Sequence, residues 1–180
     1  KSTRKLGDVI VRKWNTNGTV IWSTYYGGAA ADVPTCITRD TLHNIYFAGY
    51  TQSNNGIALG NAFKANYDIY DAFIVKMDSL GNPIWGTYYG GNDEDRINTI
   101  AVIDTVLIVG GYTGSTNNIA STNAHQNTVG STIDGFIAQF DIYGNRNWGT
   151  YIGGSKEDYV KSLKVTPHQD VYVYLETFSD

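Results

Sequence analysis

A 21-residue stretch occurs three times in this chain at a fixed spacing. The middle copy, residues 71–91, reads DAFIVKMDSLGNPIWGTYYGG, and residues 8–28 and 134–154 follow the same pattern. The second and third copies are identical at 12 of 21 positions, and all three begin 63 residues apart. Such a period indicates a repeat protein, in which each unit packs on the next. It divides the chain into the end of a preceding unit (1–7), repeat 1 (8–70), repeat 2 (71–133) and a truncated repeat 3 (134–180).

Within repeat 2, four short apolar runs predict four β-strands. Phe73, Val75 and Met77 alternate with Ile74 and Lys76, which is the two-residue period of a strand. Three further strands are expected over 84–89, 97–103 and 106–112. A glycine turn joins the strand at 73–77 to the strand at 84–89, so that these two form a hairpin. No helical period is present. Four strands linked up and down in one unit predict one blade of a β-propeller. The expected fold is therefore all-β, with tandem four-stranded antiparallel blades in about three repeats and a partial ring.

Two long polar segments, residues 51–70 and 113–133, separate the strands of neighbouring units. They match each other, because Ile57-Ala58 corresponds to Ile119-Ala120 and Asn61-Ala62 to Asn123-Ala124. These segments are therefore parts of the repeat, and we expect them to be ordered. Loops of this length in a compact domain often carry function.

A fuller motif, D-x-F-[IV]-x-K-x-D-x-x-G-x-x-x-W-x-T-Y-x-G-G followed by G-Y-T-x-S, resembles the SBBP β-propeller repeat family. The residues that carry the resemblance are Asp71, Phe73, Lys76, Asp78, Gly81, Trp85, Thr87, Tyr88, Gly90, Gly91, Asp95, Gly111, Tyr112, Thr113 and Ser115. The chain departs from the motif at Ile10, Asn15 and Gln139. The resemblance implies a large secreted or surface protein of bacteria, with no catalytic residues to assign.

Three tryptophans and three aspartates hold equivalent positions in the repeats. For Trp22, Trp85 and Trp148 we expect a structural role, in which the indole packs against the next blade and its N–H donates to a backbone acceptor. Asp32, Asp95 and Asp158 each follow a Gly-Gly pair by four residues. We expect these carboxylates to accept backbone N–H bonds in a turn.

A calcium site is the alternative for the acidic turn of repeat 2, where Asp93, Glu94 and Asp95 adjoin. Repeat 1 has alanines before Asp32, and a repeated metal site would keep its ligands in each unit. We therefore expect no cofactor, and calcium remains the only candidate.

For the repeated tyrosines, the cysteine and the histidines, the sequence favours structural or surface positions over a catalytic or binding role. The pairs Tyr25-Tyr26 and Tyr88-Tyr89, with Tyr151, could form a sugar-binding platform. Packing is favoured, with one tyrosine of each pair buried and its neighbour more exposed. Cys36 is expected to be a core thiol. The histidines share no ligand spacing, and each is expected in a loop or at the surface; they are His43, His125 and His168.

Composition limits the partners of this chain. A formal charge of −4 argues against nucleic acid, which requires clustered Lys and Arg, and no apolar run approaches a membrane span. We expect an extracellular or cell-surface scaffold, without catalysis, that binds a protein or glycan ligand or copies of itself in adhesion or assembly. The alternatives are a carbohydrate-active propeller enzyme with a site in the channel, and a filament subunit that stacks through blade edges.

Fewer than three full units are present, whereas small propeller rings have four or more blades. Either the sequence is a piece of a longer protein, or identical chains combine into a ring or stack. A piece of a longer protein is the favoured expectation, and an oligomer is the alternative.

Overall fold

The structure is a computed structural model that describes residues 7–180, and within this range it is entirely β. The described residues therefore hold no helix that could cross a membrane. The interpretation of residues 1–7 as the end of a preceding unit falls, except for Gly7, outside the described residues. The strands are β1 (Val9–Trp14), β2 (Val20–Tyr26), β3 (Asp32–Arg39), β4 (Ile45–Thr51), β5 (Ala72–Met77), β6 (Pro83–Tyr89), β7 (Asp95–Ile103), β8 (Val106–Thr113), β9 (Asp134–Asp141), β10 (Arg146–Ile152), β11 (Asp158–Val165) and β12 (Val171–Thr177).

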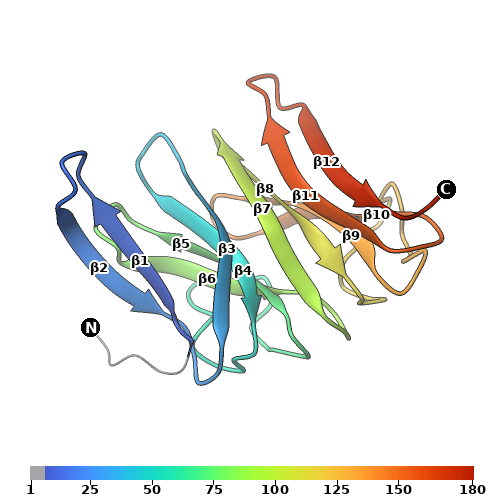
Figure 1. The fold of residues 1–180 in the computed structure, drawn as a ribbon, viewed down its shortest axis with the longest axis horizontal. Coiled ribbons are helices and arrows are strands. Elements are labelled where there is room, and N and C mark those ends of the chain that lie inside the picture. The colour runs from blue at the N-terminus through green and yellow to red at the C-terminus, as the bar shows by residue number, and fades with distance from the viewer. Residues whose placement is uncertain (1–6) are drawn as a thin grey trace.

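The strands form two complete four-stranded sheets with a two-stranded hairpin at each end. The first sheet has the order β3-β4-β5-β6 and the second β7-β8-β9-β10, and all neighbours are antiparallel. The N-terminal hairpin is β1-β2 and the C-terminal hairpin is β11-β12. Figure 1 shows these four parts in a row, with the two hairpins at opposite ends. The sheets have the form expected of propeller blades, and none of them closes on itself within the described residues.

The sheets are offset by half a unit from the sequence repeat, which corrects the expected composition of a blade. Repeat 2 supplies β5 to β8, but these four strands do not make one sheet. Instead β5 pairs with β4, which comes from repeat 1, across the long loop of residues 52–71. Likewise β9 pairs with β8 across residues 114–133. Each complete sheet thus combines the second half of one repeat with the first half of the next, so neighbouring repeats are held together by strand pairing.

Apolar side chains fill the space between successive sheets. One cluster lies between the two complete sheets and includes Tyr46, Ile74 and Ile100. A second cluster packs the N-terminal hairpin on the first sheet, and a third packs β11 on the second sheet. Because β5 is covered on both faces, every residue of this strand is buried. The prediction that 106–112 is covered on both sides is confirmed for β8, whose residues are nearly all buried.

The same glycine turn closes the hairpin three times, as the repeat predicts. Gly18, Gly81 and Gly144 have φ of +85°, +85° and +95°, which glycine adopts without strain. In the second turn the Asp78 carboxylate accepts hydrogen bonds from the Leu80 and Asn82 amides, both at 2.9 Å. These local bonds set the turn and hence the register of each hairpin.

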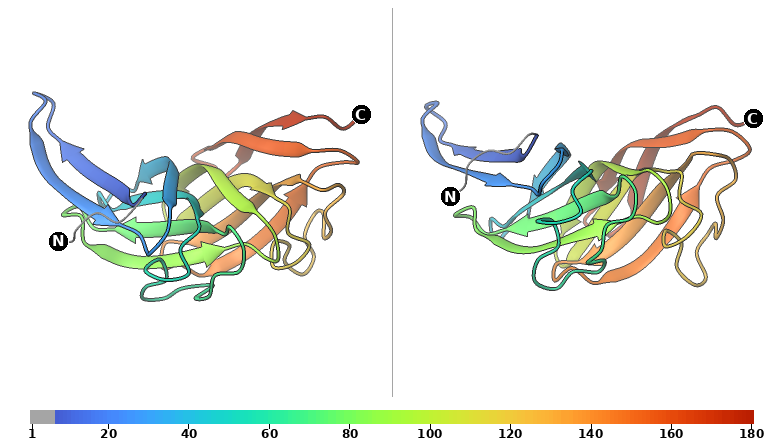
Figure 2. Two further views of the ribbon diagram at one scale, coloured as in Figure 1. Left: turned by 60° about the horizontal axis from the view of Figure 1, so that its bottom comes forward. Right: turned by 90° about the horizontal axis from the view of Figure 1, so that it is seen from below.

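Both long loops run along the same side of the row. Figure 2 shows residues 52–71 and 114–133 projecting below the sheets, while the two end hairpins rise on the other side. A rigid row of sheets therefore carries two ordered loops side by side.

Candidate functional site

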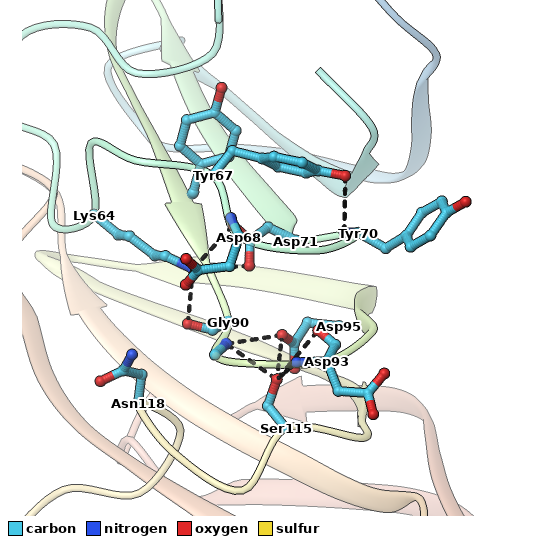
Figure 3. Close-up of polar contacts among 12 residues, drawn as sticks. Lys64, Tyr67, Asp68, Tyr70, Asp71, Gly90, Asp93, Asp95, Ser115 and Asn118 are labelled. Carbon is cyan, nitrogen blue, oxygen red and sulfur yellow. Dashed lines mark hydrogen bonds and ion pairs between the residues drawn. The ribbon is translucent and has the colours of Figure 1, made fainter. Parts of the chain in front are cut away.

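A buried carboxylate in each unit accepts hydrogen bonds from a Gly amide and a Ser hydroxyl, and in the first two units from a Thr hydroxyl as well. Asp95 accepts hydrogen bonds from the Gly91 amide at 2.9 Å, from the Ser115 hydroxyl at 2.8 Å and from the Thr113 hydroxyl. Figure 3 shows Ser115 beside this carboxylate. Asp32 receives the equivalent bonds from Gly28, Ser53 and Thr51, and Asp158 from Gly154 and Ser179. The three aspartates singled out in the sequence therefore tie the start of the loop to the Gly-Gly turn.

Burial distinguishes these otherwise equivalent carboxyls. Burial raises the pKa of Asp95 to about 7, against the opposing effect of its hydrogen bonds from Thr113, Ser115 and Gly91. For Asp158, at the open end of the row, burial also acts to raise the pKa, but the hydrogen bonds from Thr177, Gly154 and Ser179 outweigh it and the pKa is lowered. The physical cause is that Asp95 lies between two complete sheets, where a charge is poorly solvated.

Four buried tyrosines hold the middle of the loops. Tyr26 and Tyr89 donate to the carbonyls of Ile57 and Ile119, at 2.6 Å and 3.1 Å. Tyr88 donates to the Ser53 carbonyl at 2.8 Å, and Tyr151 makes the equivalent bond to Ser115 at 2.9 Å. Each loop is therefore held by one tyrosine from each of two neighbouring hairpins.

These tyrosines cannot form an exposed platform for a sugar. Tyr26, Tyr88, Tyr89 and Tyr151 are all buried, and Tyr25 alone is half-buried. The expectation that one tyrosine of each pair is exposed is wrong for Tyr88-Tyr89. The reason is that β6 has a packed neighbour on both faces, so alternation along the strand does not separate an inside from an outside.

Lys64 anchors the far end of the first loop by a buried ion pair. Its Nζ lies 2.8 Å and 2.9 Å from the two carboxylate oxygens of Asp71, 2.9 Å from Asp68 and 3.0 Å from the Gly90 carbonyl. Burial raises the pKa of Asp71, and the lysine opposes that shift. In the second loop Gln126 occupies the corresponding place and donates to Asp134 at 3.0 Å. Figure 3 shows Lys64 between Asp71 and Gly90.

Lys64 was not predicted from the sequence. The second loop has Gln126 at the corresponding position, so comparison of the two loops did not show a shared residue type. Ser53, Ser115 and Ser179 were also not singled out as a set. Their signal was available, since each follows a threonine by two residues, in Thr51-x-Ser53, Thr113-x-Ser115 and Thr177-x-Ser179.

The three acidic side chains of the turn considered for calcium point into separate contacts. Asp95 accepts the hydrogen bonds from Gly91, Thr113 and Ser115. Asp93 accepts a hydrogen bond from the Glu94 amide at 2.7 Å, and the Glu94 carboxylate lies 2.5 Å from the Arg96 guanidinium. In the described residues no group of three or more His, Cys, Asp or Glu side chains is placed to hold a metal ion.

Cys36 and the histidines lie away from any catalytic arrangement in the described residues. Cys36 packs beside the core between the complete sheets, and burial raises the pKa of its thiol to about 11. Such a thiol is a poor nucleophile. The histidines are all exposed in turns or loops, as expected; they are His43, His125 and His168.

Two of the three repeated tryptophans make the predicted contact with the next sheet. The Trp22 indole N–H donates to the Ser79 carbonyl at 3.1 Å, and Trp85 donates to the Ile142 carbonyl at 3.0 Å. Trp148 occupies the same position in β10, but among the described residues no further hairpin with a glycine turn follows to supply its acceptor.

Repeats 1 and 2 therefore each have a hairpin, a tryptophan that contacts the next sheet, and a loop that Asp, Thr and Ser side chains hold in place. The sequence of one such segment matches a known family. Residues 21–57 match the model of the SBBP family, described as a beta-propeller repeat. The resemblance to this family is confirmed. The matched segment runs from the tryptophan hairpin through β3 and β4 into the anchored loop, and so includes Trp22, Asp32 and Ser53.

Two curated proteins are similar to much longer parts of the chain. One is an uncharacterized WD repeat-containing protein of Acanthamoeba polyphaga mimivirus, 22% identical over 88% of this chain and 13% of that protein. The other is the regulatory protein FlaEY of Caulobacter vibrioides, 31% identical over 67% of this chain and 12% of that protein. The chain thus spans about an eighth of the length of these relatives. The family match and the name of the first relative together indicate a repeat scaffold.

Proposed function

We propose that this chain is a non-catalytic scaffold of a secreted or cell-surface protein, and that its loops bind a protein or glycan ligand in adhesion or assembly. The extracellular setting rests on the family resemblance alone. The binding role rests on how the loops are built. Buried hydrogen bonds hold both loops in place, so a ligand would bind without having to order them.

Tyr70, in the first loop, is the observation that carries this proposal. It is 42% exposed and has a φ of +47°, a conformation that costs a non-glycine residue on the order of 1–2 kcal/mol. Gly7, at the end of the preceding unit, holds the corresponding position, with φ of +85°. The carbonyls of both residues accept the same backbone bond, from Asp95 and Asp32 respectively, each at 2.9 Å. A strained, exposed tyrosine where glycine would suffice points to a use for the side chain.

The surroundings of Tyr70 suit recognition. Its ring projects away from the buried carboxylates, as Figure 3 shows. Ile69 beside it is 52% exposed, and the Asp68 carboxylate is partly open to solvent. An aromatic ring, an aliphatic side chain and an acid on a fixed loop form a surface that can bind a ligand by contact and charge.

Tyr70→Gly tests the proposal, because it removes the ring and also relieves the backbone. We expect the free energy of unfolding to stay the same or rise by up to about 1 kcal/mol, measured in urea. On a printed glycan array and in peptide display against the immobilised chain, ligands selected by the native chain should bind the variant at least about tenfold more weakly.

Tyr143→Gly is the matched control, since Tyr143 is 65% exposed in a turn without positive φ. It should lose about 0.5–1 kcal/mol of stability and keep ligand binding. The proposal is wrong if neither probe selects a ligand, or if Tyr70→Gly binds as well as the native chain. Release of new reducing ends from a bound glycan would favour the carbohydrate-active enzyme instead.

A further inference from the structure

Arg96, the second residue of β7, makes a contact between the two complete sheets. Its guanidinium carbon lies 4.0 Å from the centre of the Tyr50 ring in the first sheet. It lies 5.7 Å from the centre of the Tyr112 ring, which is its cross-strand partner in β8. Figure 1 shows β7 in the middle of the row, so described strands flank this contact on both sides. The contact therefore does not depend on what adjoins either end of the row.

Packing between neighbouring sheets does not by itself require an arginine at this position. The equivalent residues, each second in its strand, are Val33 of β3 and Tyr159 of β11. Tyr159 packs on Tyr112 with ring centres 5.1 Å apart, and this contact is equivalent to that of Arg96 with Tyr50. A neutral ring thus serves at the next junction, so the charge and the donors of Arg96 go beyond what the fold needs.

The guanidinium of Arg96 is held in one orientation and keeps free donors. Its Nε is buried and lies 2.5 Å from Oε1 of Glu94, which also accepts a hydrogen bond from the Tyr112 hydroxyl at 3.2 Å. The Arg96 side chain is 33% exposed, and within the described residues its terminal nitrogens, Nη1 and Nη2, donate no hydrogen bond. These two nitrogens form the end of a planar fork that can bind one carboxylate through two parallel hydrogen bonds.

The exposed ring of Tyr70 comes from the same edge of the molecule. The amide of Asp95, the residue before Arg96, donates to the Tyr70 carbonyl at 2.9 Å. The first loop therefore brings an exposed aromatic residue to the end of β7 that carries the arginine. An aromatic ring offers apolar area to one face of a pyranose, and an arginine fork binds a carboxylate on it.

Acidic side chains beside Arg96 limit the kind of anion that fits. Glu94 lies against the guanidinium, and Asp93, next to it in the chain, is exposed. These carboxylates would repel a ligand with several adjacent negative charges, such as a run of acidic residues in a peptide. A sugar with a single carboxylate avoids most of this repulsion, and its hydroxyl groups can donate hydrogen bonds to the acids.

We propose that Arg96 and Tyr70 form a binding site for an acidic sugar, a pyranose that carries one carboxylate. The carboxylate binds Nη1 and Nη2 of Arg96, and the Tyr70 ring packs against the sugar. Glu94 and Tyr50 are positioning residues that hold the guanidinium. Uronic acids and sialic acids both have this chemistry. The inference rests on the proposed binding role of the loops and names the class of ligand.

Titration of the isotope-labelled chain with defined sugars tests this site directly by NMR. The acidic probes are a tetrasaccharide of galacturonic acid and sialyllactose, and a tetrasaccharide of galactose lacks the carboxylate. At least one acidic probe should shift the side-chain signals of Arg96 and the amide signal of Tyr70, and the probe that does so identifies the source of the carboxylate. The neutral tetrasaccharide should bind at least about tenfold more weakly.

Arg96→Tyr supplies the residue that repeat 3 has at this position, so the chain should fold and keep a contact with Tyr50. Its affinity for the acidic probe should fall at least about 30-fold. Arg96→Lys keeps the charge without the fork and should lose about tenfold, whereas a purely structural arginine would leave both affinities unchanged. Arg39→Gln is the matched control, because it removes one charge from an exposed arginine at the opposite end of β3 and should bind like the native chain.

The outcomes separate this inference from the proposed function. The acidic-sugar site is wrong if neither acidic probe shifts Arg96, or if Arg96→Tyr binds the probe as tightly as the native chain. If the native chain then still binds neutral glycans or peptides through Tyr70, the binding role of the loops stands and only the ligand class is wrong. Tighter binding of an oligoglutamate peptide than of either acidic sugar would assign the fork to a peptide and would also overturn the proposal.

Discussion

Asp95 and Asp158 show how the same residue with the same partners acquires different properties along a repeat. Both carboxylates accept hydrogen bonds from a Gly amide and a Ser hydroxyl. Their pKa values nevertheless shift in opposite directions, to about 7 for Asp95 and downward for Asp158. Desolvation between two complete sheets outweighs the hydrogen bonds at Asp95, and at the open end it does not.

Asp95 should make stability fall as pH rises through neutrality. Its folded-state pKa of about 7 lies above the usual 3.8, so the folded chain holds one proton more between these values. That contribution is present at low pH and is lost as pH rises towards 7. Lowering the pH from 8 to 5.5 should therefore raise the free energy of unfolding by about 2 kcal/mol in the native chain relative to Asp95→Asn. Urea unfolding across that range measures the difference.

Asp158→Asn is the control for this pH dependence. The depressed pKa of Asp158 places its titration in the acid range, so its contribution to stability is constant between pH 8 and 5.5 and is lost only below. The variant should parallel the native chain over this interval. Equal slopes for the native chain and Asp95→Asn would show that Asp95 is ionised in the fold.

Residue-level prediction from sequence succeeded where a role repeats and failed where one unit differs. The indole hydrogen bonds of Trp22 and Trp85 were predicted from their spacing and are confirmed. Lys64 and Tyr70 were not found, because their counterparts in other units are of different types. Comparison of the repeats identifies the residues that every unit needs for packing. It cannot identify a residue that is present in one unit only.

At the level of elements, the strands could be predicted but not their grouping into sheets. The alternation in β5 and the apolar run of β8 are local patterns, and both strands lie where the sequence places them. The pairing of β4 with β5 spans a 20-residue loop, and no local pattern reports it. A period of 63 fixes the length of the repeating unit, but it leaves open where one sheet ends and the next begins.

The tyrosine bonds predict that each loop can be loosened separately. Tyr88→Phe keeps the ring and removes the donor to the buried Ser53 carbonyl, which should cost about 1–3 kcal/mol locally. Hydrogen exchange should then speed up in residues 53–57 and stay unchanged in 115–119. Tyr151→Phe, which loses the bond to Ser115, should give the reverse pattern. If either variant loosens both loops, the loops are one cooperative unit and not two separately anchored ones.

For the molecule as a whole, the open row of sheets explains features that no single element does. The exposed Ile37, the uncovered Gly18 and the cavity beside Trp148 lie at the two ends of the row. Each has an equivalent in the middle of the row that is covered by a neighbouring sheet. The sequence predicted that three blades would not close, and the structure identifies the surfaces that remain to be covered.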